Sequence, residues 1–434
     1  MGVSKLKYDI SIIIPIYNVE KYLTDCLNSV CHQTKEDIEI ICIDDCSTDD
    51  SSKVIDEFAQ MDDRIKVIRN QKNCGRLYAR KSGVLEAVGK YIMFLDGDDF
   101  YSEDACEIAY SQIESESVDI LQFGMNIINK GNAPQYEVDS FSNFVMPYEG
   151  KIEKESVLKS CFVDEKYNYN LVNKIYKTEL CKKAFANLDD RYYCMAEDLL
   201  AYFVLSYYAE SYAGITDKLY NYNFAIGVSK PGALDLEGLD RRCAGAESVA
   251  AVERFLTGQG TFDEYQDAYQ KIERRILSDN FDAWYYRLPS DKREEGYAIF
   301  EKHWGKDKVI LGLLYDIENK QYDINQKGNR INELGNELTC ARRRFDEELT
   351  CERERFDKEL AQKNLVIDQL DRENNILTQR LEEKTSLYEK TEQERNDAQA
   401  QYEHVLNSLS YKIGCAVTWL PRKIAGVIRR TKNR

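Results

Sequence analysis

The sequence predicts an α/β protein with a mostly parallel sheet, followed by a helical region and a long C-terminal coiled coil. Three observations support this class. In the first third of the 434-residue chain, short apolar runs rich in β-branched residues alternate with segments of helical apolar spacing. From about residue 325 to 408 the sequence is charged and leucine-rich and contains no proline. The final residues, 411–434, are basic and interleaved with apolar side chains.

Apolar runs in the first third are expected to form the parallel strands. The four clearest runs are Ile10–Ile16, Ile38–Ile43, Ile65–Ile68 and Tyr91–Leu95, and residues 118–123 are expected to add a fifth. Segments 19–30 and 75–88 between them have the apolar spacing of crossover helices. Ligands of such sheets bind beyond the carboxyl ends of the strands, so the residues that follow each run are the candidates for a site.

The C-terminal third contains an internal repeat. The segment Glu337–Cys340 recurs as Glu348–Cys351, and Arg344–Asp346 recurs as Arg355–Asp357, which gives a period of about 11 residues. This pattern predicts one long helix that forms a self-associating coiled coil at 325–408, and hence a homo-oligomer. A single solvated helix is the alternative. Residues 236–322, before it, are expected to be a helical extension.

The last segment, 411–434, contains seven basic residues, no acidic residue and Trp419. Such a basic amphipathic segment is typical of contact with an anionic membrane surface. A disordered basic tail is the alternative, because basic segments with little core-forming sequence stay unfolded.

Composition limits the partners and the compartment. The formal net charge of −17 gives no electrostatic reason to expect nucleic acid. The thirteen cysteines have no paired C-x-x-C spacing, and no apolar run is long enough for a signal peptide or a membrane span. We therefore expect a cytoplasmic protein, held at the inner face of the membrane by its tail. Only three histidines occur, so the chemistry is expected to belong to carboxylates.

An acidic cluster follows the fourth predicted strand. Asp96 and Asp98 are two residues apart in extended chain and therefore point to one side, while Gly97 lets a ligand approach closely. Their oxygens, with those of Asp99, suit Mg²⁺ or Mn²⁺, and such an ion would neutralise a bound diphosphate. A strand-to-helix turn built from Asp and Gly is the alternative.

Other polar residues are expected at the same sheet edge. Asp44 and Asp45 follow the second strand, and Pro15 and Tyr17 end the first. An aromatic ring with several carboxylates there suits a base, a ribose and a metal-bound diphosphate, although residues 47–49 could simply cap a helix. Arg80, near the start of the 75–88 helix, could meet phosphate oxygens or form a surface ion pair.

Four motifs in this order resemble those of the family 2 glycosyltransferases, which have the Rossmann-like GT-A fold. The segments that carry the resemblance are Ser11–Asn18, Asp44–Asp49, Asn73–Arg80 and Leu95–Asp99. The resemblance implies nucleoside contacts from Pro15, Tyr17 and Asp45, an Arg80 near the diphosphate, and metal and donor-sugar contacts from Asp96 and Asp98. It also implies inversion at the anomeric carbon. We add Asp44 to the nucleotide-binding set and Asp99 to the metal-binding set.

The base of an inverting transfer is expected to be a carboxylate. Glu197-Asp198 is similar to the family's Glu-Asp motif, which implies that Asp198 is the catalytic base; an N-cap for a helix beginning at Leu199 is the alternative. The sequence departs from the family's third motif at Arg76 and Tyr78, where small residues are commoner, and at Lys81, where asparagine is usual. No Gln-x-x-Arg-Trp motif is present, which indicates transfer of one sugar per acceptor.

The sequence therefore predicts a hexosyltransferase domain at 1–235, with a nucleotide-binding half at 10–123 and an acceptor half at 124–235. It would move a sugar from a UDP-sugar to a glycan, lipid-linked or protein-linked acceptor in bacterial surface polysaccharide or glycoprotein synthesis. Two other functions remain open. One is a coiled-coil scaffold with an inactive nucleotide-binding domain, and the other is a nucleotidyltransferase of similar fold.

Overall fold

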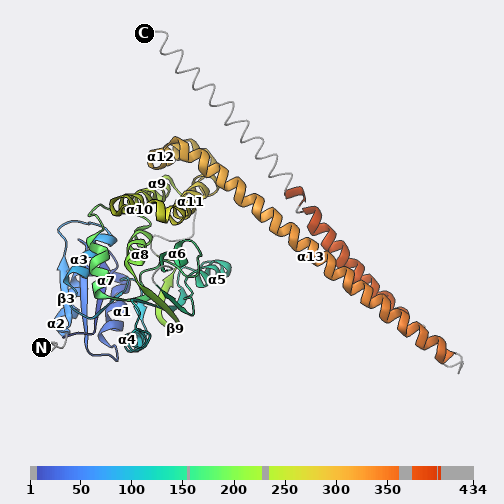
Figure 1. Ribbon diagram of the computed structural model, residues 1–434, viewed down its shortest axis with the longest axis horizontal. Helices are drawn as coiled ribbons and strands as arrows, with labels where there is room; N and C mark the ends of the chain where they lie inside the picture. Colours follow the sequence, from blue (N-terminus) through green and yellow to red (C-terminus); the bar gives the residue numbers. More distant parts are fainter. Residues whose placement is uncertain (1–6, 154–156, 227–233, 361–373, 398, 402–434) are drawn as a thin grey trace, which may run out of the picture. The chain divides into compact units, whose positions relative to one another are not determined.

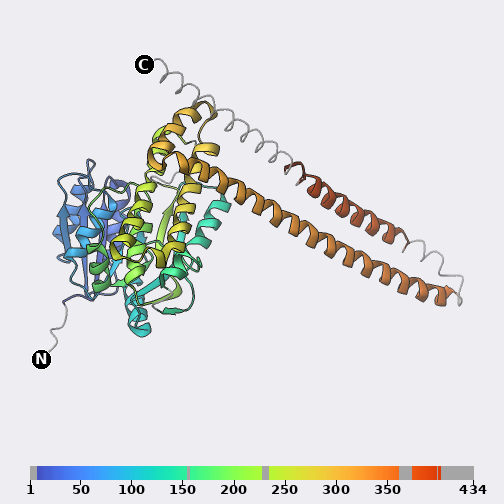
Figure 2. The same ribbon diagram turned by 45° about the horizontal axis from the view of Figure 1, so that its top comes forward.

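The structure is a computed structural model that describes residues 7–153, 157–226, 234–360, 374–397 and 399–401. It divides into two compact units, residues 1–312 and 313–434. The first unit contains a mixed sheet with helices around it, as Figures 1 and 2 show.

A nine-stranded sheet organises the first unit, in the order β3-β2-β1-β4-β8-β6-β9-β5, with β7 paired to β9. The strands are β1 (Ile10–Ile16), β2 (Ile38–Asp44), β3 (Ile65–Arg69), β4 (Tyr91–Phe94), β5 (Phe100–Tyr101), β6 (Ile120–Asn129), β7 (Lys151–Glu153), β8 (Lys174–Lys177) and β9 (Ser211–Phe224). The strands β3, β2, β1 and β4 are parallel, and β8 runs antiparallel to both β4 and β6.

The predicted parallel strands are confirmed. Nearly every side chain of β1, β2 and β4 is buried, which explains why these strands appear as continuous apolar runs and not as alternating patterns. The fifth run is confirmed as the start of β6, which continues to Asn129. It does not lie beside β4, because β8 is inserted between them.

Helices surround this sheet. Their bounds are α1 (Glu20–Cys31), α2 (Ser51–Met61), α3 (Arg76–Glu86), α4 (Ala105–Glu116), α5 (Gln135–Phe144), α6 (Val157–Phe162), α7 (Thr178–Ala186), α8 (Glu197–Tyr208), α9 (Leu236–Cys243), α10 (Gly245–Gln259), α11 (Gln266–Asp282) and α12 (Arg293–Trp304). Short helical turns lie between α10 and α11, at Asp263–Tyr265, and between α11 and α12, at Ala283–Arg287 and Ser290–Lys292. Helix α3 packs on β1 and β2 and also contacts α7 and α8, which brings together segments more than 100 residues apart.

A lysine is buried in the core of this unit. Lys174 on β8 is fully buried, and its Nζ donates to the carbonyl of Asn170 and lies 4.8 Å from the ring centroid of Tyr202. Burial lowers the pKa of Lys174 from 10.5 to about 7. Between about pH 7 and pH 10.5 the Lys174 side chain is therefore protonated in the unfolded chain and neutral in the folded chain. Stability must therefore rise with pH across that window.

Replacing this lysine by an uncharged residue should flatten the pH profile of stability. From about pH 7.5 to about pH 9.5 the free energy of unfolding of the wild type should rise, relative to that of Lys174→Met, by on the order of 2 kcal/mol. Urea unfolding of both proteins at the two pH values measures the difference. Parallel profiles for the two proteins would show that Lys174 keeps its proton in the folded state.

The described residues of the second unit are helical. Helix α13 (Lys306–Leu360) begins in the first unit and continues into the second, where residues 374–397 are also helical. Lys384 Nζ donates to the carbonyl of Ala341 at 3.3 Å and lies 4.3 Å from the ring centroid of the buried Phe345. The two segments thus lie side by side, as both views show (Figures 1 and 2).

This contact corrects the expectation of one long helix. A straight helix would separate two residues 43 positions apart by about 65 Å, so Ala341 and Lys384 belong to two different helical segments. No helix among the described residues is long and apolar enough to span a membrane. The basic segment 411–434 lies outside the described residues, and so does part of the predicted coiled coil.

Self-association through 325–408 stays a prediction. A chain that ends at Tyr322 should be monomeric in light scattering, whereas the full chain should form a discrete oligomer, because its apolar helical stripe needs a partner. If both chains scatter as monomers, the pairing of helices within one chain already satisfies the stripe, and the predicted oligomer does not form.

Candidate active site

The predicted site residues gather at one edge of the sheet. Strands β1, β2 and β4 are parallel and in register, with Ile16 paired to Asp44, so the segments that follow them emerge together. The Asn18 side-chain oxygen accepts from the Thr48 backbone N–H at 2.8 Å, which ties the segment after β1 to the segment after β2. Helices α3 and α8 bring further charged residues to this edge.

Arg80 joins two of the predicted carboxylates. Its side chain is fully buried; one guanidinium nitrogen donates to Asp96 Oδ1 at 2.7 Å, and the other donates to Asp198 Oδ1. Burial alone would raise the pKa of Asp96, but the charges of Arg80 and Arg76 outweigh it and lower that pKa. The alternative of a surface ion pair for Arg80 is therefore wrong.

Asp198 is the second residue of α8, and the residue that caps this helix is Ala196. The N-cap alternative for Asp198 is therefore wrong. Its side chain is 26% exposed, and one oxygen is taken by Arg80. A partly exposed carboxylate with one oxygen held by an arginine can accept a proton from an incoming group.

Asp98 and Asp99 complete the acidic cluster. Burial raises the pKa of Asp98, and the neighbouring charge of Asp96 raises it further. Burial raises the pKa of Asp99 well above its usual range, with added repulsion from Asp98. Both oxygens of Asp99 accept hydrogen bonds from β9, one from the Tyr220 hydroxyl and one from the Asn223 backbone N–H, each at 2.7 Å. Asp99 thus fixes the loop that presents the other two aspartates.

This cluster fits a hard divalent cation. Asp96, Asp98 and Asp99 each place one carboxylate oxygen within 4.8 Å of the other two. Oxygen ligands are those that Mg²⁺ and Mn²⁺ prefer, and a cation would relieve the repulsion that raises the pKa of Asp98. The carboxylate oxygens of these three residues therefore fit the predicted metal site.

The residues predicted to hold the nucleotide lie beside this cluster. Tyr17 follows β1 and is 44% exposed, whereas Pro15 lies within β1 opposite Ile43. Asp44 is buried and accepts hydrogen bonds from Ser47 and Ser52, so its carboxylate stabilises the turn after β2.

Asp45 shapes the segment before α3. Its carboxylate accepts from the backbone N–H groups of Cys74 and Gly75 at 2.9 and 2.8 Å and from the Asn70 amide at 2.7 Å. Gly75 has φ +89°, and a Cβ there would lie 3.0 Å from the ring of Tyr192. Only glycine fits this position without strain, so the glycine of the third motif sets the direction in which α3 starts.

Several residues of this edge could not be identified from the sequence. Tyr220 and Asn223 anchor Asp99, and Tyr192, which is 57% exposed, packs on Gly75. Arg76 forms an ion pair with Glu197 at 3.1 Å. Of these, Arg76 gave a signal in the sequence as a departure from the family's motif, and Glu197 gave one as part of the Glu-Asp motif.

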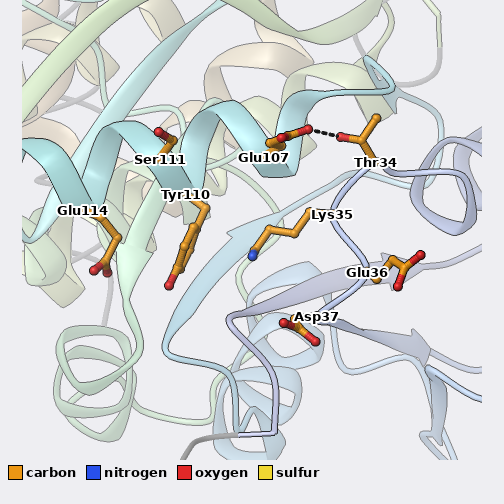
Figure 3. Close-up of a pocket in the computed structure, with 8 residues that line it drawn as sticks. All are labelled: Thr34, Lys35, Glu36, Asp37, Glu107, Tyr110, Ser111 and Glu114. Carbon is orange, nitrogen blue, oxygen red and sulfur yellow. Dashed lines mark hydrogen bonds between the residues drawn. The ribbon is translucent and has the colours of Figure 1, made fainter.

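A cavity of about 680 Å³ lies elsewhere, at the amino-terminal side of β2 against α4. Figure 3 shows its lining, with the Lys35 side chain directed towards Tyr110. Lys35 Nζ lies 4.0 Å from the centroid of that ring and 2.6 Å from Asp9, so its charge is already compensated. The cavity is at the opposite end of the parallel strands from the acidic cluster, and it holds none of the predicted site residues.

The sheet and the acidic cluster at its carboxyl edge define an α/β protein whose candidate site is built from carboxylates and arginines. Residues 11–168 match the family model described as glycosyl transferase family 2. This match identifies residues 11–168 as a family 2 glycosyltransferase domain.

Curated glycosyltransferases are similar to part of this chain. The chain is 38% identical over 112 residues to the glycosyltransferase GlyG of Streptococcus pneumoniae, across 26% of this chain and 37% of that protein. It is 28% identical over 176 residues to the poly(ribitol-phosphate) β-N-acetylglucosaminyltransferase TarS of Staphylococcus aureus, across 40% of this chain and 28% of that protein. The matches thus span well under half the length of these relatives.

Among solved structures, S. aureus TarS 1–349 in complex with UDP-GlcNAc is similar at a TM-score of 0.44 and 20% sequence identity, across 72% of this chain and 91% of that chain.

Proposed function

We propose that this chain transfers a single sugar from a UDP-sugar to a glycan acceptor, with inversion at the anomeric carbon and with Mg²⁺ or Mn²⁺. The acceptor class, lipid-linked or protein-linked, follows from the predicted role in bacterial surface polysaccharide or glycoprotein synthesis. The observation that supports the proposal best is the bridge that Arg80 makes between Asp96 and Asp198. It holds the proposed metal ligand and the proposed base on the two sides of one guanidinium.

Each residue of the site has a proposed role that follows from its position. Asp96 and Asp98 would hold the metal ion, and Asp99, whose oxygens accept from Tyr220 and Asn223, would keep their loop in place. When bound, the ion would neutralise the diphosphate and stabilise the charge of the leaving group. Tyr17, with its exposed ring, would stack on the base, and Pro15 and Asp45 would shape the nucleoside contact.

Asp198 would take the proton of the acceptor hydroxyl. One of its oxygens accepts from Arg80 and its side chain is 26% exposed, so an acceptor hydroxyl could reach the other oxygen. A base held in this way needs little reorganisation when the acceptor arrives. Arg80, buried at the same point, would balance the charge of the carboxylates around it.

A screen of nucleotide sugars tests the function. UDP-, GDP-, dTDP- and ADP-linked sugars are incubated with the full chain and Mn²⁺, and release of the nucleoside diphosphate is measured with and without a chelator. We expect release from a UDP-sugar that stops when the chelator is added. If no nucleotide sugar is hydrolysed and none binds, the chain is not a transferase of this kind.

The two other functions make different predictions in the same screen. A scaffold with an inactive domain would bind a nucleoside diphosphate but would not cleave any of the nucleotide sugars. A nucleotidyltransferase would consume a nucleoside triphosphate and release pyrophosphate. The intact carboxylates Asp96, Asp98 and Asp198 favour the transferase over an inactive domain.

A further inference from the structure

Arg76 occupies a special place at the edge of the acidic cluster. It is the first residue of α3, directly after the glycine that Asp45 holds. Its side chain is 48% exposed, and one of its guanidinium nitrogens lies 3.1 Å from Glu197 Oε1. Glu197 itself is only 10% exposed, so this pair joins an exposed cation to a buried anion.

The charge of Arg76 reaches the proposed metal site. The carboxylate of Asp96 is the largest cause of the raised pKa of Arg76, and Glu197, Asp198 and Asp98 also contribute, although burial opposes them. In return, Arg76 counteracts the raised pKa of Asp98. Glu197 directly precedes Asp198, which Arg80 joins to Asp96, so the ion pair with Glu197 places the guanidinium beside these carboxylates.

The two arginines of this cluster differ in what they can still bind. Arg80 is fully buried, and two of its nitrogens donate to Asp96 and Asp198. Arg76 is half exposed, and Glu197 is the one hydrogen-bond partner recorded for its guanidinium among the described residues. Arg76 is thus the arginine of the pair that an arriving anion can reach.

We propose that Arg76 binds a phosphate oxygen of the donor's diphosphate, as a cationic contact in addition to the metal ion. The inference rests on the proposed function, because it requires a nucleoside diphosphate in this site. A guanidinium presents a planar fork of N–H donors that matches phosphate oxygens, and it keeps its charge at every physiological pH. Placed beside Asp96 and Asp98, it offsets their repulsion of the diphosphate.

A purely structural ion pair is the competing explanation, and the chain offers a matched control. Arg69 on β3 pairs with Asp56, and both side chains are about as exposed as that of Arg76. This pair involves none of the residues of the acidic cluster. Arg69→Gln therefore measures what the loss of a surface ion pair does to nucleotide binding.

Calorimetry of the full chain tests the proposal. The titrants are the nucleoside diphosphates UDP, GDP, ADP and dTDP and the nucleoside of whichever diphosphate binds, each with Mn²⁺ and with a chelator. We expect Arg76→Gln to weaken binding of that diphosphate about tenfold with Mn²⁺, as the loss of one partly exposed charge-assisted hydrogen bond requires. With the chelator the loss should be larger, because the metal ion then no longer offsets the aspartates. Arg76→Lys, which keeps the charge without the fork, should recover part of the affinity.

The nucleoside carries no phosphate, so its binding distinguishes the loss of a phosphate contact from a general disturbance of the site. Binding of the nucleoside should be the same for the wild type, Arg76→Gln and Arg69→Gln. If Arg76→Gln leaves diphosphate affinity unchanged, or weakens the nucleoside by the same factor, Arg76 does not contact phosphate. If the wild type binds no nucleoside diphosphate at all, the proposed function itself fails, and this inference fails with it.

Discussion

Asp198→Asn is expected to lower the rate of sugar transfer by about a thousandfold while leaving affinity for the donor nucleotide within a factor of about three. The amide has the size of the carboxylate, and its oxygen can still accept from Arg80, so the bridge to Asp96 is kept. What is lost is the ability to take a proton from the acceptor. Steady-state transfer and calorimetric titration with the nucleoside diphosphate measure the two quantities on one preparation.

A control for this variant lies close by in the sequence. Asp190 is 67% exposed and pairs with Lys81 on the surface, so Asp190→Asn removes a carboxylate without touching the cluster. It should leave both transfer and binding unchanged. If Asp198→Asn lost nucleotide binding together with transfer, Asp198 would act by holding Arg80 in place and not as the base.

The inner strands of the parallel half of the sheet, β1, β2 and β4, were predictable because they are buried on both faces. Such strands appear in the sequence as uninterrupted apolar runs, and β1 and β2 are of this kind. Strand β8 gave no such signal. It is four residues long, it begins and ends with lysine, and its place between β4 and β6 depends on pairing with residues far away in the chain.

The acidic edge was predictable for a related reason. A strand of the parallel sheet that ends in carboxylates places them at the ligand-binding edge, which identified Asp45, Asp96 and Asp98 as candidates. The partners of these residues could not be found in this way. Arg80 and Asp198 are 118 positions apart, and Asp99 and Asn223 are 124 apart. Only the packing of α3 against α8, and of β9 against the loop after β4, brings them together.

Asp98→Asn is expected to remove the metal dependence of donor binding, with a loss on the order of a hundredfold in affinity measured with Mn²⁺. The reason lies in the charges of the cluster. Burial and the charge of Asp96 raise the pKa of Asp98 although Arg76 opposes them, so the metal-free protein carries a repulsion that a bound cation would relieve. Removing one negative charge relieves this repulsion and at the same time removes a ligand oxygen.

Thermal unfolding with Mn²⁺ and with a chelator separates these two effects. An ion at a hundredfold excess over its Kd should stabilise the wild type by about 3 kcal/mol, whereas Asp98→Asn should gain nothing from Mn²⁺. With the chelator the variant should be at least as stable as the wild type. Asp99→Ala should instead be less stable than the wild type both with Mn²⁺ and with the chelator, because it removes the acceptor for Tyr220 and Asn223. An Asp98→Asn protein that Mn²⁺ stabilises as much as the wild type would show that the ion binds elsewhere, and Asp98 would then be only part of the turn after β4.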